Sequence, residues 1–187
     1  MIFWIILIIF SLYLIVTYNS LINIKHNVEK AWANIDVLLK QRNDELPKLI
    51  DTCRVYMTHE AQTLQKVIQA RAGVDSARET HDVAALNLAE SALTSSLGGL
   101  FAVAENYPNL KADQTFLNLQ QRITGLENQI ADRREFYNDT ATNNNVRIKQ
   151  FPDVIVAVLF GFERAEMLKF SSEQLKDIDV AARFNRQ

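Results

Sequence analysis

Three histidines and one cysteine are the side chains of this sequence best suited to metal or nucleophilic chemistry. A di-iron site in a helical bundle needs a Glu-x-x-His pair on each of two helices. The residues three places before His26, His59 and His81 are Asn, Tyr and Arg, so that motif is absent. His59 with Glu60 does not begin a His-Glu-x-x-His zinc motif either, because Thr63 fills the last position. We therefore expect no metal site.

Other catalytic patterns are missing as well. Cys53 falls on an apolar stripe and is better read as a small buried hydrophobe than as a nucleophile. Gly98 and Gly99 lack the glycine and lysine spacing of nucleotide-binding loops, and there is no Gly-x-Ser-x-Gly elbow. The net charge of −2 gives no general attraction to nucleic acid. The sequence predicts a protein that is not an enzyme, with no cofactor and no nucleic-acid partner.

The amino-terminal segment is the strongest feature of the chain. From Ile2 to Tyr18 it is apolar except for Ser11 and Thr17. Roughly 17 residues of helix reach about 26 Å, close to the ~30 Å of a bilayer core. A cleaved signal peptide needs a basic start and a small-residue cleavage site, and this segment has neither. We predict a retained transmembrane anchor over residues 1–23 that contacts the bilayer between Ile2 and Tyr18.

Charge gives this anchor an orientation. Trp4 and Tyr18 suit the two membrane interfaces, and basic residues follow the span at Lys25, Lys30 and Lys40. The positive-inside rule places such a flank in the cytoplasm. We expect a single-pass protein with its amino terminus outside and its carboxy-terminal bulk in the cytoplasm.

The remainder of the chain has a helical pattern. Only 5 glycines and 3 prolines occur, which argues against an all-β fold rich in tight turns. Apolar residues recur at steps of three and four from Leu21, so one helix is expected from the anchor to about Ala72. Pro47 predicts a kink or a break, and the unbroken phase of the pattern favours a kinked continuation. The first turn is expected within residues 73–81.

Two more long helices are expected after that turn. The second runs from Val83 to Tyr107, and its paired Gly98 and Gly99 predict a close approach to another backbone. Residues 106–109 end it. The third begins near Asp113 and ends at Phe151 and Pro152. The predicted fold class is all-α, with a transmembrane helix continuing into an antiparallel bundle of three to four helices.

Polar residues interrupt the third helix. Arg133 and Arg134 stand where an apolar residue is due, and residues 143–145 are three asparagines. Solvated or locally hydrogen-bonded side chains are the favoured interpretation. A polar seam that fixes the register between neighbouring helices is the alternative.

The segment from Val154 to Phe162 is apolar on every face but too short to span a membrane. A buried fourth helix is the default interpretation. An interface between subunits and a segment dipping into the membrane surface stay open. After it, Ser171 with Gln174 forms a weak capping box for a short terminal helix.

Several blocks of residues identify a family resemblance that covers nearly the whole chain. The chain resembles the LemA family in Ala31-Trp32, Leu46-Pro47-Lys48-Leu49, Ala104-Glu105-Asn106-Tyr107-Pro108-Asn109-Leu110-Lys111, Phe136-Tyr137-Asn138-Asp139, Phe151-Pro152 and Leu159-Phe160-Gly161-Phe162. The main departure is the run of asparagines at 143–145, where the family tends to have Tyr-Asn.

The resemblance implies a bacterial inner-membrane protein with one amino-terminal anchor and a cytoplasmic antiparallel helical bundle. It implies no established enzymatic activity and favours membrane organisation over catalysis. The domains expected are the anchor (1–23), a LemA-like bundle (24–170) and a tail or short helix (171–187).

Two functions follow as hypotheses. The first is a non-enzymatic membrane scaffold that self-associates through the long, heptad-like stripes of its helices. The second is a membrane-tethered adaptor that regulates a partner such as a membrane protease or a signalling protein. Structural roles are the favoured reading of the aromatic and polar block at 136–139. The candidate interaction surface consists of Tyr137, Asn138, Asp139, Val154, Val158, Leu159, Phe160 and Phe162.

Overall fold

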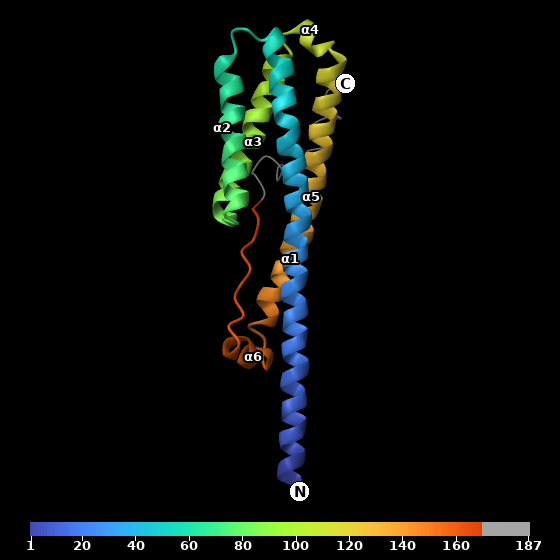
Figure 1. Cartoon of the computed structure of the whole chain (residues 1–187), viewed down its shortest axis with the longest axis vertical. Coiled ribbons are helices and arrows are strands. Elements are labelled where there is room, and N and C mark those ends of the chain that lie inside the picture. Colours follow the sequence, from blue (N-terminus) through green and yellow to red (C-terminus); the bar gives the residue numbers. More distant parts are fainter. Residues whose placement is uncertain (170–187) are drawn as a thin grey trace, which may run out of the picture. The chain divides into compact units, whose positions relative to one another are not determined.

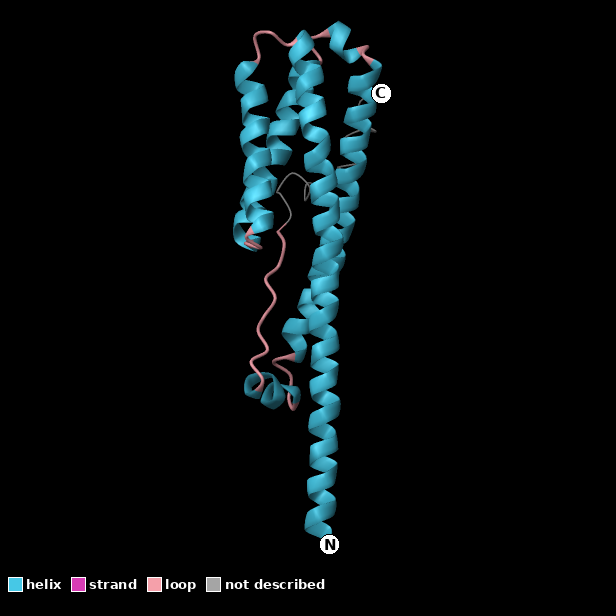
Figure 2. Cartoon of the chain, viewed as in Figure 1, coloured by secondary structure: helices cyan, strands magenta, loops and turns pink. Residues whose placement is uncertain are grey.

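The protein is helical throughout the part that the structure describes. The computed structural model describes residues 1–169, and Figures 1 and 2 show helices and loops there, without a strand. The helices are α1 (Ile2–Tyr56), α2 (Ala61–Glu79), α3 (Val83–Ala104), α4 (Pro108–Lys111), α5 (Gln114–Arg147) and α6 (Asp153–Leu159). The all-α prediction is confirmed. The short helix expected within 171–187 lies outside the described residues.

The chain forms two compact units. Unit 1 consists of Met1–Leu49 and Leu117–Leu168, and unit 2 consists of Ile50–Phe116 together with Lys169. The anchor and α6 therefore belong to unit 1, whereas the α2–α3 pair belongs to unit 2. The predicted division into an anchor, a bundle and a tail remains a prediction.

In unit 1, α1 and α5 run antiparallel. Arg147 Nη2 lies 3.3 Å from Ser20 Oγ, and the Trp32 and Tyr137 rings are 5.7 Å apart between centroids. Residue numbers thus rise along one helix as they fall along the other. The apolar stripes meet in a core of fully buried side chains: Leu21, Ile35, Leu39, Leu46, Ile123 and Ile130.

Helix α1 continues through Pro47, so the break that the sequence left open does not occur. Proline removes one backbone hydrogen bond and crowds the preceding turn, which costs about 3 kcal/mol in a helix interior. Leu46 and Leu49, on either side of it, are both fully buried. Burying each leucine contributes roughly 1.5–3 kcal/mol, enough to offset the cost of the proline.

The first interruption of the helices was misplaced by sequence. Helix α1 ends at Tyr56, and α2 starts at Ala61, well before the turn expected at 73–81. The residues between contain no glycine or proline, and buried Met57 and Leu64 continue the apolar pattern across the gap. Side-chain contacts within unit 2 mark the break: the Tyr107 hydroxyl donates to Glu60 Oε1 at 3.3 Å.

Unit 2 contains the α2–α3 helical hairpin. Its turn at 80–82 places His81 at a φ of 54°, and Asp82 caps α3 by accepting from the Ala85 backbone N–H at 2.8 Å. Capping by an aspartate satisfies one of the free N–H groups at a helix start. The helices bury Leu64, Val67, Val74, Leu86, Leu93 and Leu97.

The predicted close packing at Gly98 and Gly99 is wrong. Both glycines are exposed, and a Cβ added at either would meet nothing within 4 Å. They fall on the outer face of α3. The glycine of this hairpin that lies near the neighbouring helix is Gly73, where an added Cβ would be 3.5 Å from the Ala89 Cβ, an ordinary van der Waals distance.

The third long helix starts where sequence placed it. Helix α3 ends at Ala104, and the short α4, which sequence did not resolve, begins at Pro108 with Tyr107 as its cap. Asp113 then caps α5: its Oδ1 accepts from the Phe116 backbone N–H at 3.0 Å, and the Tyr56 hydroxyl donates to its Oδ2 at 2.8 Å. These two hydrogen bonds, the Phe116 one first, lower the pKa of the Asp113 carboxyl.

We predict that Arg42→Ala destabilises the protein by about 3 kcal/mol, because removing one member of a buried ion pair strands the other. Arg42 is fully buried, and its Nη1 lies 2.8 Å from Glu127 Oε1. Urea unfolding of the full chain in mild detergent, followed by circular dichroism, measures the loss. Lys48→Ala is the matched control, since Lys48 pairs with Glu45 from an exposed position and is expected to change stability by less than ~1 kcal/mol. Equal effects of the two substitutions would contradict this.

A second prediction concerns how the contribution of Asp113 to stability depends on pH. The lowered pKa of Asp113 means that folding favours its charged form. Its contribution is present above the unfolded pKa of about 3.9 and is lost as the pH falls through the lower folded value. Asp113→Asn is expected to lower the melting temperature by about 1–3 °C at pH 7, with the difference from wild type shrinking below about pH 4. Exposed Asp44→Asn is the control. A difference that stays constant from pH 7 to pH 3 would refute the assignment.

Candidate interaction surface

The polar side chains on the α1–α5 interface divide into buried and exposed sets. Arg134 is only 4% exposed and lies on the buried stripe of α5, whereas the adjacent Arg133 is exposed. Of the favoured interpretation, solvated or locally hydrogen-bonded side chains, solvation does not apply to Arg134. Together with the Arg42–Glu127 pair, Arg134 makes part of the interior of unit 1 polar, and the register-fixing seam stays a prediction.

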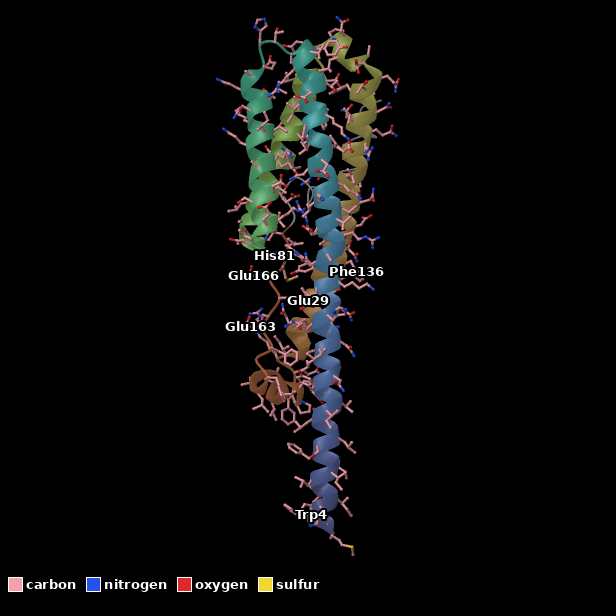
Figure 3. The ribbon with its side chains drawn as sticks, viewed as in Figure 1. Trp4, Glu29, His81, Phe136, Glu163 and Glu166 are labelled. Carbon is pink, nitrogen blue, oxygen red and sulfur yellow. The ribbon has the colours of Figure 1, made fainter. Side chains whose placement is uncertain are left out.

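Residues 162–168 form an extended segment, here called the strap, that lies against α5. Asn145 makes two hydrogen bonds to one strap residue: its Oδ1 accepts from the Ala165 N–H at 2.8 Å, and its Nδ2 donates to the Ala165 carbonyl at 2.9 Å. Asn138 repeats this arrangement with Leu168, at 2.9 and 2.7 Å. Figure 3 labels Glu163 and Glu166 on the strap. The side-chain amides of two asparagines thus make the hydrogen bonds to this segment that the backbone of a neighbouring strand would otherwise make.

Two more α5 side chains complete this attachment. The Tyr137 hydroxyl donates to the Glu166 carbonyl at 2.8 Å, and Asn144 Nδ2 donates to the Glu163 carbonyl at 3.2 Å. Tyr137 is 4% exposed, and burial, with a smaller effect from Glu166, raises its pKa. Of the candidate surface residues, Tyr137 and Asn138 therefore act inside the chain. Asp139 is exposed.

Helix α6 and the residues directly after it contribute the other candidates, and α6 is not a buried fourth helix. Val156 and Ala157 are buried in one cluster with Leu21 and Ile148. On the other side Val158 is 78% exposed and Leu159 69% exposed. A helix this short has room to bury one face only. Phe160 is also exposed, while Val154 and Phe162 are half-buried.

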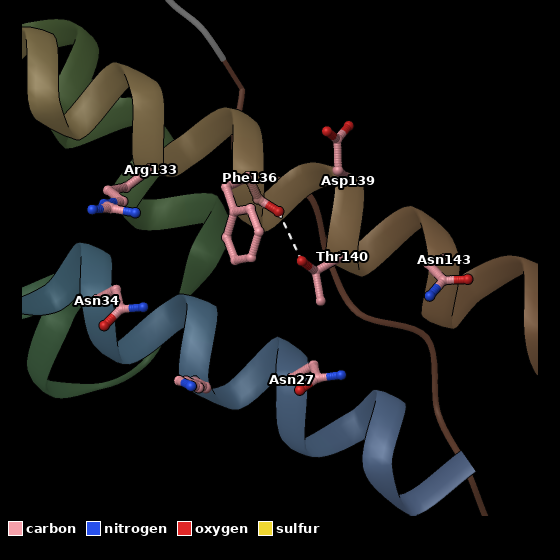
Figure 4. Close-up of a pocket in the computed structure, with 8 residues that line it drawn as sticks. Asn27, Asn34, Arg133, Phe136, Asp139, Thr140 and Asn143 are labelled. Carbon is pink, nitrogen blue, oxygen red and sulfur yellow. Dashed lines mark hydrogen bonds between the residues drawn. The ribbon is translucent and has the colours of Figure 1, made fainter. Parts of the chain in front are cut away.

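A polar groove runs between α1 and α5 on another side of unit 1. Its lining residues are Asn27, Lys30, Asn34, Arg133, Phe136, Asp139, Thr140 and Asn143. Figure 4 shows the Phe136 ring projecting between the two helices, with Thr140 Oγ1 donating to the Phe136 carbonyl at 2.8 Å. Phe136 is 54% exposed, so its expected role as core volume is wrong. Two cations and one carboxylate make the groove weakly basic.

The side chains of residues 1–169 that could bind a metal or act as a nucleophile are not gathered in one place. This part of the chain has no group of three or more His, Cys, Asp or Glu side chains placed to hold a metal ion. Cys53 is fully buried, and desolvation raises its pKa to about 12, so it stays a neutral thiol. This agrees with its interpretation as a small hydrophobe.

Sequence reasoning missed the attachment of the strap and the polar groove. The sequence does contain a sign of the strap's attachment: Asn138 and Asn145 are seven residues apart and so share one face of a helix. What they bind could not be inferred, since backbone groups of an extended segment have no sequence pattern. The groove gives no signal, because exposed amides on two helices look like ordinary solvated faces.

The fold defines a class: an all-α protein whose amino-terminal helix is long and apolar enough to serve as a membrane anchor. Within residues 1–169, α1 alone is long and apolar enough to cross a bilayer, with a mean hydropathy of 2.3 over its most apolar window. Only 11% of that window is buried in the protein. The chain belongs to the LemA family, whose sequence profile matches residues 31–182. It is therefore a membrane-associated LemA-family protein.

Named relatives agree with this assignment. Magnetosome protein MamQ 2 of Paramagnetospirillum magneticum is 25% identical over 176 residues, covering 82% of this chain and 65% of its own length. Protein LemA of Metamycoplasma hominis is 26% identical over 163 residues, covering 87% of this chain and 74% of its own. The chain thus spans slightly less than two thirds of the MamQ protein.

We predict that Asn145→Ala frees the strap. Each side-chain-to-backbone hydrogen bond contributes about 1 kcal/mol, so losing two is expected to speed amide hydrogen exchange at residues 163–166 roughly tenfold or more. Exchange in the intact chain, read by mass spectrometry, measures this. Asn143→Ala, at an exposed position on the same turn of α5, is the control and leaves exchange unchanged. Unchanged exchange in the Asn145 variant would show that packing alone holds the strap.

Proposed function

We propose that this protein is a non-enzymatic scaffold of the bacterial inner membrane that self-associates through unit 1. The observation behind the proposal is the continuity of α1, a single helix of 55 residues from Ile2 to Tyr56. Its first part has the length and hydropathy of a membrane span, and its later turns pair with α5. A bundle built directly on a membrane helix has its position relative to the bilayer fixed, as a scaffold requires.

The side of the membrane follows from charge. Lys25, Lys30 and Lys40 follow the apolar segment, and the positive-inside rule assigns such a flank to the cytoplasm. The bundle accordingly lies in the cytoplasm and the amino terminus outside.

The relatives support a role in membrane organisation. MamQ is named as a magnetosome protein, and this chain aligns with 65% of its length. The comparison with MamQ supports the proposal only for the part that the two chains share.

The polar groove between α1 and α5 is the surface proposed for self-association. Phe136 offers a half-exposed aromatic ring, and asparagines from both helices supply donors and acceptors around it. An aromatic residue surrounded by polar side chains is typical of protein interfaces. Symmetric pairing of two copies would bury each copy's Phe136 in the other's groove.

The competing proposal uses the same groove for a foreign partner. Lys30 and Arg133 outnumber Asp139 there, so the groove suits an acidic helix or loop of a partner protein. In that case the protein is an adaptor that holds one regulated protein at the membrane.

The mass of the full-length protein in mild detergent tests the scaffold. We expect a defined assembly larger than a monomer, and cross-linking in intact membranes is expected to give the same number of copies. Phe136→Ser is expected to shift the assembly toward monomer by at least about tenfold in its dissociation constant, as loss of one interface aromatic does. Val55→Ser removes an even more exposed apolar side chain from unit 2 and serves as the control.

A monomer in both detergent and membranes would overturn the scaffold. Recovery of one stoichiometric foreign protein with that monomer, lost on Phe136→Ser, would establish the adaptor in its place.

A further inference from the structure

Helix α6 exposes an apolar face that nothing else in the described structure covers. Ile155 is 56% exposed, Val158 78%, Leu159 69% and Phe160 54%, while Val156 and Ala157 on the opposite face are buried. Between residues 154 and 162 there is no charged side chain at all. Four large apolar side chains gathered on one short helix are unusual for a surface in water.

The position of α6 along α1 identifies what covers this face. The cluster beneath α6 includes Leu14, Tyr18 and Leu21 of α1. The Tyr13 hydroxyl lies 3.4 Å from Asp153 Oδ1, and the Tyr18 and Phe160 rings are 4.7 Å apart between centroids. Figure 1 shows α6 beside the amino-terminal half of α1. Helix α6 therefore stands level with residues 13–21.

That level lies within the part of α1 that has to be in lipid. The first charged side chain of the sequence is Lys25. Counted from Ile2, a ~30 Å hydrocarbon core takes about 20 residues of helix, so it ends close to residue 22. Anything packed against residues 13–21 on the outside of α1 is then at the membrane boundary or inside it. This holds for either orientation of the anchor.

We propose that α6 is a second membrane contact, which inserts Ile155, Val158, Leu159 and Phe160 into the lipid beside the end of the transmembrane helix. Amphipathic helices of this kind bury their apolar face about 5–10 Å into the boundary between headgroups and acyl chains. The covering partner is the bilayer itself. The inference rests on the membrane anchor and not on self-association.

The charged groups around α6 fit this placement. Asp153, the one acidic residue of the helix, is 7% exposed, and its Oδ2 lies 2.9 Å from Arg147 Nη2. Arg147, about a third of whose side chain is exposed, also reaches Ser20 Oγ at 3.3 Å, so both of its polar contacts are to groups of the protein. Exposed Lys149 and Arg164 flank the apolar segment on both sides, as basic residues do at the headgroup level.

Lipid is favoured over a second copy of the chain as the partner of this face, because the apolar surface of α6 lies beside that of the spanning part of α1. Ile15 and Val16 of α1 are 56% and 67% exposed and belong to the spanning segment. The exposed face of α6 continues this apolar surface at the same depth, so the lipid that covers one extends over the other. Two contacts with the bilayer, in place of one, limit how far unit 1 can tilt about its anchor.

The test uses the full-length chain with Cys53→Ser, labelled with the environment-sensitive fluorophore NBD at one introduced cysteine. Val158→Cys reports on α6. Val16→Cys in the span is the lipid reference, and Val37→Cys, 55% exposed on α1 about 24 Å beyond Leu21, is the water reference. Each protein is placed singly in phosphatidylcholine nanodiscs. Doxyl-labelled phosphatidylcholine quenches probes in lipid, and iodide quenches probes in water.

We expect the probe at 158 to follow the probe at 16. Doxyl lipid is expected to quench it at least threefold more than the probe at 37, and iodide at least threefold less. A probe at 158 that behaves like the one at 37 would overturn the proposal. So would a probe at 158 shielded from both quenchers, because protein would then cover α6.

A matched pair of substitutions tests the face itself. Phe160→Ser and Phe136→Ser each remove a ring that is 54% exposed in unit 1. Phe160→Ser is expected to reduce doxyl quenching at 158 by about half, and Phe136→Ser to leave it unchanged. Equal effects would refute a specific lipid contact. Because each disc holds one copy, the result is independent of whether the scaffold proposal survives.

Discussion

One constraint organises unit 1: α1 is a single helix whose first part is long and apolar enough to cross a bilayer and whose later turns enter the bundle directly. A helix satisfies its own backbone hydrogen bonds, so the chain can pass between the two solvents without exposing a polar backbone group. Its side chains change their partners on the way. Up to Val16 they are almost all exposed, and from Thr17 and Leu21 onward one stripe becomes buried against other parts of unit 1. The remaining elements of this unit cover that stripe.

The packing of α5 against the buried stripe of α1 has a specific register because some of the contacts between the two helices are polar. Leucine and isoleucine along α1 and α5 would tolerate a shift of one helical turn, since apolar contacts have little directionality. A fully buried arginine does not, because Arg42 shifted by a turn would lose its hydrogen bond to Glu127. Arg122 reaches the buried Glu45 across the same pair of helices at 3.1 Å. Ionic contacts thus select one antiparallel register from several that packing alone would accept.

Sequence reasoning succeeded where periodicity decides the structure. It predicted the anchor segment, the long α3 and α5, and the stop at Tyr107 and Pro108. It failed at residues 57–60, where a break occurs without glycine or proline and without a change in the apolar pattern. At Gly98 and Gly99 it treated residue type as a sign of packing, although both lie on an outer face.

The candidate surface divides in the same way. The sequence singled out the segment that contains α6 because it is apolar on every face. Composition alone cannot say which of these faces packs against the rest of the protein. Tyr137 and Asn138 were predicted as candidate interaction residues, and a structural role was favoured for the block to which they belong. Their partners are backbone groups of Glu166 and Leu168, about thirty positions along the chain. Only the folded arrangement connects them.

The geometry of the strap explains why asparagines stand at these places. Seven residues of helix, from Asn138 to Asn145, rise about 10.5 Å. Three residues of extended chain, from Ala165 to Leu168, span about 10 Å. The two repeats coincide, so both side-chain amides meet a residue whose N–H and C=O point toward α5. An extended segment without a neighbouring strand leaves its backbone groups unpaired, and asparagine alone among short side chains offers both a donor and an acceptor in the spacing of a peptide group. Side chains of a helix thereby pair with the backbone of an extended segment that has no neighbouring strand, and this segment connects directly to α6.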